Sequence, residues 1–169
     1  FGICSYRFDM KTAIIIPARY ASSRFPGKPL TLIAGKTLLI RVWEKCQQAF
    51  PANDIYIATD DERIAKHGRE SGMNVLMTSV NCLTGTDRVY EASLQLDYDL
   101  YINVQGDEPL ISSGDIKSIH QVALHNPKTI VCGMGKIAEE VDFRSASVPK
   151  VVCRTDGRLL YMSRAPVPT

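Results

Sequence analysis

The 169-residue chain lacks several features that would place it in a common class of proteins. It has no apolar run near the roughly 18 residues that a membrane-spanning helix needs, and its start lacks the basic, apolar and cleavage segments of a signal peptide. Its net charge is only +2, from 20 basic and 18 acidic residues, which gives no global reason to expect nucleic acid or a membrane as partner. Its five cysteines form no CxxC pair, so we expect reduced thiols and a cytoplasmic location.

Common nucleotide and hydrolase motifs are missing as well. The GKP at residues 27–29 does not complete a Walker A loop, and the GMG at residues 133–135 lacks the third glycine of a dinucleotide fingerprint. No Gly-x-Ser-x-Gly elbow occurs. The histidines lack the spacing of a zinc site, and we expect each on a helix surface: His67, His120 and His125. Redox and hydrolytic functions therefore have little support.

Short apolar runs alternate with amphipathic segments along most of the chain. The expected strands cover residues 13–16, 54–58, 75–77 and 100–104. The expected helices cover residues 37–49, 61–71, 86–96 and from Ser112 or Ser113 to about 125, with Thr59 or Asp60 capping the second and Gly72 ending it. This alternation predicts an α/β fold, a three-layer α/β/α sandwich with a mainly parallel, Rossmann-like sheet.

The domain organisation is expected to be simple. Residues 10–169 should form a single domain, and residues 1–9 a leader or a cloning remnant. The tail after about residue 129 should contain strands at 129–137, 148–152 and 159–162, the last two joined by a turn at 155–157. Such a tail would form a small β lobe or a dimerisation arm. The chain stops just after a strand-like segment, so we expect a downstream part to be missing.

A basic, proline-rich segment follows the first expected strand. Residues 17–29, PARYASSRFPGKP, contain three prolines and a glycine, which predicts a loop and excludes a helix or a ladder strand. Loops at the carboxyl ends of strands bind ligands in open α/β sheets. The cations of this loop suit a polyphosphate through charge-assisted hydrogen bonds: Arg19, Arg24 and Lys28. The alternative is a solvated basic loop that binds nothing.

Carboxylates follow two other expected strands. Mg²⁺ is usually held by one or two protein carboxylates together with substrate phosphates and water, and Asp107 in QGDEP is the preferred candidate. The alternative for Asp107 is a helix cap. Gly106 beside it would let the backbone come close to a ligand. Asp60 and Asp61 are interpreted as a cap and first-turn acids of an exposed helix.

Two further segments offer cations near element ends. TGTDR at residues 84–88 places hydroxyls, a glycine and Arg88 at a helix start, where backbone amides collect anions or read a base edge. An ordinary helix cap is the alternative there. YMSR at residues 161–164 is a late strand that ends in Arg164, and an ordinary amphipathic strand end is its alternative.

Five motifs, in this order and at these intervals, resemble one family. PARYASSRFPGKPL, ATDDERI, TGTDRV, NVQGDEPLI and YMSRAPVP are similar to those of the bacterial 3-deoxy-D-manno-octulosonate (KDO) cytidylyltransferases, also called CMP-KDO synthetases. The resemblance covers nearly all of residues 10–168 and is weakest over residues 136–147, which match no motif. PGKPL together with QGDEP separates this group from the acylneuraminate cytidylyltransferases.

The resemblance implies that CTP and KDO react to CMP-KDO and pyrophosphate with Mg²⁺, for lipopolysaccharide biosynthesis, in a homodimer. It implies catalytic roles for Arg19, Lys28 and Asp107, with Asp107 also binding the metal, and sugar contacts from Gln105 and Arg164. Arg88 is implied to face the nucleotide or the sugar, and Ala18 to lie near the cytosine through its backbone. The residues implied to bind CTP are Pro17, Ala18, Arg19, Arg24, Lys28, Thr86 and Arg88.

Family members continue beyond this endpoint and carry a second metal-binding aspartate in a VDTPED-like motif, which is absent here. We therefore expect this chain to bind CTP weakly and to turn over poorly. One alternative is the same chemistry on 8-amino-KDO or another acidic keto-sugar, and another is a non-catalytic nucleotide-binding remnant or partner subunit. A GTP- or UTP-dependent transferase would need a GxG start, which ARYASSR contradicts.

Overall fold

The computed structural model describes residues 10–21 and 25–166. The chain divides into two compact units, of which the first ends at Val131 and the second begins at Cys132. Within the described ranges, no helix is both long and apolar enough to cross a membrane.

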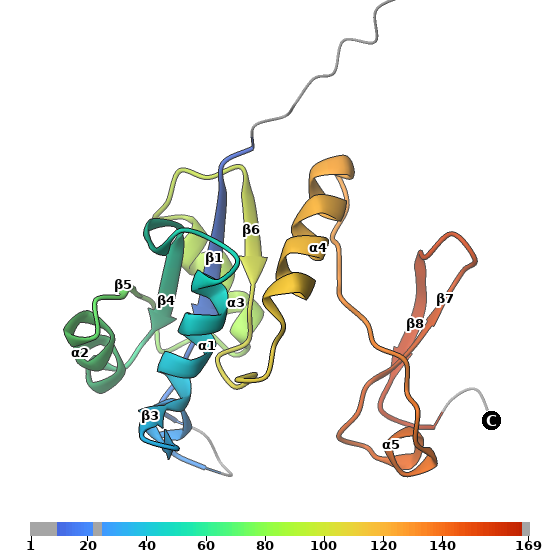
Figure 1. Ribbon diagram of the computed structural model, residues 1–169, viewed down its shortest axis with the longest axis horizontal. Helices are drawn as coiled ribbons and strands as arrows, with labels where there is room; N and C mark the ends of the chain where they lie inside the picture. Colours follow the sequence, from blue (N-terminus) through green and yellow to red (C-terminus); the bar gives the residue numbers. More distant parts are fainter. Residues whose placement is uncertain (1–9, 22–24, 167–169) are drawn as a thin grey trace, which may run out of the picture. The chain divides into compact units, whose positions relative to one another are not determined.

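A four-stranded parallel sheet forms the centre of the first unit (Figure 1). Its strands are β1 (Thr12–Pro17), β4 (Ile55–Thr59), β5 (Asn74–Met77) and β6 (Leu100–Asn103), in the order β5-β4-β1-β6. β1 lies between β4 and β6, with Ile14 paired to Ile55 on one side and to Ile102 on the other. The apolar run of β1 is therefore buried in the middle of the sheet, as the sequence predicts for a parallel strand.

Helices cover both faces of this sheet. Ile14 and Ile16 of β1 belong to a core with α1 (Leu38–Gln47), α2 (Glu62–Glu70) and α4 (Ser113–His125), which contribute Leu39, Val42, Cys46, Ile64 and Ile116. Ile15 points to the other face and packs with Ala58 against α3 (Gly85–Ser93), through Val89 and Ala92. Successive strand residues face opposite sides, so one isoleucine run supplies both cores. The predicted three-layer α/β/α sandwich is confirmed.

The connections of the sheet reverse direction at β1. The chain passes from β1 to β4 and β5 on one side, and then crosses back to form β6 on the other side. In open α/β sheets, ligands bind outside the carboxyl ends of the strands at such a reversal. This topology places the ends of β1 and β6, and the loops that follow them, side by side.

The second unit contains a helical turn, α5 (Glu140–Arg144), and an antiparallel hairpin of β7 (Lys150–Cys153) and β8 (Leu159–Ser163). The amino group of Lys150, which is 2% exposed, donates to the backbone carbonyls of Ser145, Val148 and Arg164. The predicted strand at residues 129–137 is wrong. The segment is rich in β-branched and apolar residues but pairs with no strand of the described chain, and Ile130 is 92% exposed.

Two local predictions need correction. The segment 17–29 does contain regular structure, because Pro17 ends β1 in register with Ala58, and Lys28–Leu30 forms a turn of 3₁₀-helix, η1. Proline is tolerated at such a start because its missing N–H would have no partner there. β2 (Leu32–Ile33) and β3 (Lys36–Thr37) then form a small hairpin. The cap of α2 is Asp61, which accepts a hydrogen bond from Arg63 N at 2.9 Å, and not Thr59 or Asp60.

Two of the histidines are less exposed than predicted. His67 of α2 lies 2.9 Å from the Thr37 hydroxyl. His120 of α4 lies 3.0 Å from the Thr12 hydroxyl and stacks edge-on against Phe50. Burial lowers the pKa of His120 below its ordinary value. Both rings therefore tie helices to neighbouring elements.

Candidate active site

A cleft of about 420 Å³ opens at the carboxyl ends of β1 and β6, a volume typical of small-molecule sites. It is lined by the end of β1 and the segment after it, the first residue of α1, the start of α3 with its cap, and the loop after β6. The lining residues are Pro17, Ala18, Arg19, Phe25, Lys28, Pro29, Leu38, Thr84, Gly85, Arg88, Gln105, Gly106 and Asp107.

The segment after β1 is held in place at both of its ends. Ala18 N donates to Ala58 O at 2.8 Å, which extends the pairing of β1 with β4 by one residue. Gly27 N donates to Tyr20 O at 2.8 Å and so closes the loop between them. Gly27 has a φ of +72°, a conformation that favours glycine. The closed loop positions Lys28 at the start of η1, at the wall of the cleft.

Lys28 and Asp107 meet across the cleft. Lys28 Nζ lies 2.7 Å from Asp107 Oδ2, and the two side chains are 41% and 54% exposed. Gly106, next to Asp107, approaches β1 so closely that an added Cβ would lie 2.7 Å from the carbonyl oxygen of Pro17. The glycine therefore brings two backbones together and fixes where Asp107 projects.

The amino end of α3 forms the third wall. Thr84 and Asp87 form a capping box, in which Thr84 N donates to Asp87 Oδ2 at 2.8 Å and Asp87 N donates to Thr84 Oγ1 at 3.1 Å. An added Cβ on Gly85 would lie 3.1 Å from Gln105 Oε1, so α3 and the loop after β6 are in close contact. The positive end of the helix dipole thus lies at the cleft.

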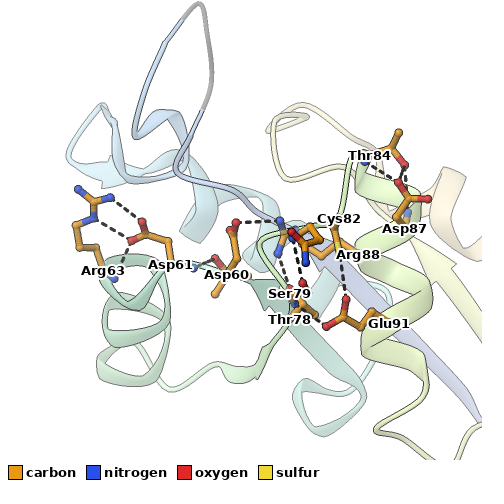
Figure 2. A network of polar contacts seen from close by, with 12 residues as sticks. Asp60, Asp61, Arg63, Thr78, Ser79, Cys82, Thr84, Asp87, Arg88 and Glu91 are labelled. Carbon is orange, nitrogen blue, oxygen red and sulfur yellow. Dashed lines mark hydrogen bonds and ion pairs between the residues drawn. The ribbon is translucent and has the colours of Figure 1, made fainter.

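Arg88 lies deeper in the same helix and is almost fully buried (Figure 2). Its Nη2 lies 3.3 Å from Asp60 Oδ2, and its Nη1 donates to the Thr78 hydroxyl. Asp60 is therefore neither the cap nor the first-turn acid of an exposed helix that the sequence predicts. It turns inward because the start of α2 is already capped by Asp61.

The structure brings most of the predicted site residues together. Those that line the cleft are Pro17, Ala18, Arg19, Lys28, Arg88, Gln105 and Asp107. Thr86 is exposed on α3 and is not among the lining residues. Arg24 lies outside the described residues. Arg164 belongs to the second unit, where its Nη1 donates to Ala146 O and Ser147 O, so its contact with a sugar stays a prediction.

Sequence reasoning missed the apolar and buried polar parts of the site. Phe25 and Leu38 line the cleft, and Asp60 and Thr78 hold Arg88 from behind it. Asp60 and Thr78 each directly follow a strand of the sheet, and that position is the signal that could have indicated them.

The cleft offers limited protein ligands for a metal ion. Among the described residues, no group of three or more histidine, cysteine, aspartate or glutamate side chains could hold a metal. Asp107 supplies the carboxylate of the cleft lining, and it is half exposed. This donor set fits Mg²⁺, which is commonly bound by one or two carboxylates together with substrate phosphates, better than it fits a metal held by protein alone.

Comparisons with known proteins identify the family of the chain. The cytidylyltransferase family model matches residues 13–169. The chain is 41% identical over 162 residues to a 3-deoxy-manno-octulosonate cytidylyltransferase of Myxococcus xanthus, covering 94% of this chain and 64% of that protein. It is 43% identical over 160 residues to the enzyme of the same name from Geobacter metallireducens, covering 94% and 63%.

A solved structure of CMP:2-keto-3-deoxy-manno-octonic acid synthetase complexed with CTP superposes with a TM-score of 0.83 at 35% identity, over 94% of this chain and 66% of that chain. A cytidylyltransferase of Leptospira borgpetersenii is less similar, with a TM-score of 0.62 at 26% identity over 69% of this chain and 50% of that chain. The chain spans about 64% of the length of the first of the curated relatives. From its sequence and its fold, the chain belongs to the cytidylyltransferase family, in the group of the 3-deoxy-manno-octulosonate cytidylyltransferases.

Proposed function

We propose that this chain carries the nucleotide-binding centre of an enzyme that transfers CMP from CTP to KDO and releases pyrophosphate. The observation that carries the proposal is the cleft itself, in which the cations Arg19 and Lys28 and the carboxylate Asp107 converge at the reversal point of a parallel sheet. The names of the similar proteins supply the substrates: 3-deoxy-manno-octulosonate for the relatives and CTP for the solved structure.

The chemistry needs positioning and charge neutralisation more than acid–base groups. A hydroxyl oxygen of the sugar attacks the α-phosphorus of CTP, the bond to the β-phosphate bridging oxygen breaks, pyrophosphate leaves and the hydroxyl proton passes to solvent. The sugar is itself a carboxylate, so both reactants are anions. Arg19 and Lys28 would hold the phosphates and offset this repulsion. Gln105 lines the same cleft and would contact the sugar.

Asp107 would be the protein ligand of Mg²⁺. When bound, the ion supplies positive charge that stabilises the phosphate oxygens and the departing pyrophosphate. The Lys28–Asp107 pair would have to open for this, so that Lys28 serves the phosphates and Asp107 the ion. Both side chains are exposed enough to rearrange without disturbing the core.

The first test is binding, measured by titration calorimetry with CTP and Mg²⁺ followed by KDO. A cytidylyltransferase should bind the nucleotide and then the sugar, whereas a nucleotide-binding remnant should ignore the sugar. Lys28→Ala should weaken CTP binding by about 1.5–3 kcal/mol, the size of a hydrogen bond to a charged group. Lys66→Ala is the matched control, because Lys66 is an exposed lysine of α2 outside the cleft lining.

The second test is turnover, measured as pyrophosphate release with KDO and with its 8-amino analogue. Pyrophosphate release should depend on CTP, on the sugar and on Mg²⁺. Binding of CTP that is unchanged by Lys28→Ala would contradict the proposed site. Faster turnover on the 8-amino analogue would move the proposal to that sugar.

The proposal includes a homodimer whose contact lies on the second unit. Two-stranded sheets are marginally stable alone, and β8 exposes half or more of each of its large apolar side chains: Leu159, Leu160, Tyr161 and Met162. A second copy of the chain could cover them. Light scattering should then show a dimer that Leu160→Asp dissociates, and a monomer at all concentrations would contradict this part of the proposal.

A further inference from the structure

Arg88 differs from the other cations of the cleft in how it is held. Its side chain is 3% exposed and leaves α3 toward the ends of β4 and β5, where Asp60 and Thr78 receive it (Figure 2). Arg19 is exposed, and its side chain makes no ion pair or hydrogen bond with any described residue. Lys28 is partly exposed and pairs with an equally accessible carboxylate. Among the described residues, the cleft lining thus contains two accessible cations, Arg19 and Lys28, and one buried guanidinium.

The groups that hold Arg88 are themselves fixed by the sheet. Thr78 N donates to Thr59 O at 2.9 Å, and Asp61 N donates to the Thr59 hydroxyl at 3.2 Å, so the chain on either side of Asp60 is anchored. α3 has a second attachment one turn after Arg88. Glu91 accepts hydrogen bonds from Ser79 N at 2.5 Å and from the Cys82 thiol at 3.1 Å (Figure 2). With these attachments the guanidinium has little freedom to reorient.

The charge of Arg88 is balanced before any ligand arrives. Asp60 Oδ2 lies 3.3 Å from Arg88 Nη2, and Asp60 Oδ1 is buried and accepts no hydrogen bond from a described residue. Arg88 is therefore the cation that neutralises Asp60 within the described part of the chain. A phosphate placed on Arg88 would gain little net attraction, because it would also meet the Asp60 carboxylate. A neutral acceptor, such as a carbonyl oxygen or a ring nitrogen, would keep the full hydrogen bond.

We propose that Asp60 is a positioning residue for nucleotide recognition: it orients and neutralises Arg88 so that Arg88 donates to an uncharged acceptor of the nucleoside and not to the phosphates. The inference rests on the proposed function, which supplies the nucleotide. It divides the cleft into a phosphate side with Arg19 and Lys28 and a nucleoside side with Arg88. Asp60 acts only through Arg88 and does not itself contact the ligand.

The test compares two ligands, CTP and inorganic tripolyphosphate, by calorimetry with Mg²⁺ on the full chain. Asp60→Asn should weaken CTP binding at least about fivefold, because Arg88 loses its fixed orientation, and should not weaken tripolyphosphate binding by more than about twofold. Lys28→Ala should weaken the binding of both ligands. Asp97→Asn is the matched control, since Asp97 is a fully exposed aspartate before the amino end of β6 and should change neither affinity.

A purely structural role for Asp60 would weaken both ligands equally, and that result would overturn the inference. An unchanged affinity for CTP would also overturn it. If Asp60→Asn fails to fold, the double variant Asp60→Asn, Arg88→Gln removes both buried charges and should show the same selective loss of CTP. A wild-type chain that binds neither ligand would contradict both the proposed function and the inference. If the wild-type chain binds CTP, the result for Asp60→Asn tests the inference alone.

Discussion

Replacing Asp107 by asparagine should increase the affinity for CTP when no divalent metal is present. Asp107 Oδ2 lies 2.7 Å from Lys28 Nζ, so the lysine that we assign to the phosphates is already paired. CTP alone must break that pair and must also approach a carboxylate of its own sign of charge. The variant removes both obstacles and keeps the size of the side chain.

The magnitude follows from the exposure of the pair. The side chains are 41% and 54% exposed, and ion pairs of this kind contribute about 0.2–1 kcal/mol. A carboxylate and a phosphate about 4 Å apart repel by about 1 kcal/mol in water. Together these give about 1–2 kcal/mol, an increase in metal-free CTP affinity of about five- to thirtyfold.

The assay is a CTP titration in EDTA and again in Mg²⁺. In Mg²⁺ the wild-type chain should bind CTP more tightly than the variant, because the variant lacks the carboxylate that we assign to the metal. CTP and Mg²⁺ should also bind the wild-type chain cooperatively. Glu108→Gln is the control: it removes the neighbouring negative charge, and Glu108 makes no ion pair with any described residue. Metal-free affinity that stays the same or falls in Asp107→Asn would refute the reasoning.

Three other predictions concern stability and packing. Burial lowers the pKa of His120, so its contribution to the free energy of unfolding is present above the unfolded pKa near 6.5 and is lost as the pH falls through that value toward the folded pKa. His120→Gln should therefore reduce the loss of unfolding free energy, measured by urea titration, between about pH 7.5 and 5.5. The same loss in the variant and the wild type would contradict this. Gly106→Ala should destabilise the fold by about 1–3 kcal/mol and weaken CTP binding, because the new Cβ meets Pro17 O; a thermal melt and a titration like those of the wild type would argue against it. Lys150→Met should increase amide hydrogen exchange over residues 145–164 but not in β1, because it leaves three backbone carbonyls without their hydrogen-bond donor. Exchange that rises equally in residues 145–164 and in β1 would show that the two units unfold together.

The layers of the fold could be predicted from the sequence because they depend on local periodicity. Each strand of the parallel sheet lies within about one residue of its expected bounds. An apolar run of four or five residues between turn signals is too short for a buried helix and is typical of a buried strand. The segment 129–137 shows the limit of this reasoning. Its apolar and β-branched residues favour a strand, but a strand also needs a partner, and no local signal reports whether a partner exists.

The candidate site was predictable as a set of loops and not as a set of contacts. Arg19, Lys28 and Asp107 could be identified because they follow strands whose ends must meet. The pairing of Asp60 with Arg88 joins residues from different elements, and the sequence alone supports an exposed helix cap equally well. The distinction depends on burial, which only the packed structure reveals. Arg164 remains a predicted sugar contact because it belongs to the second unit.

The small side chains between α3 and the sheet, Ala58 and Ala92, affect where α3 and Arg88 lie. This helix rests on β1 and β4 through Val89 and Ala92 against Ile15 and Ala58, so its axis lies close to the sheet. A bulkier residue at Ala92 would move α3 away from the sheet and would displace Arg88 with it. No residue of the binding surface would have been replaced. Substitutions behind the binding surface could therefore change the ligand preference of this fold although every residue that contacts the ligand stays the same.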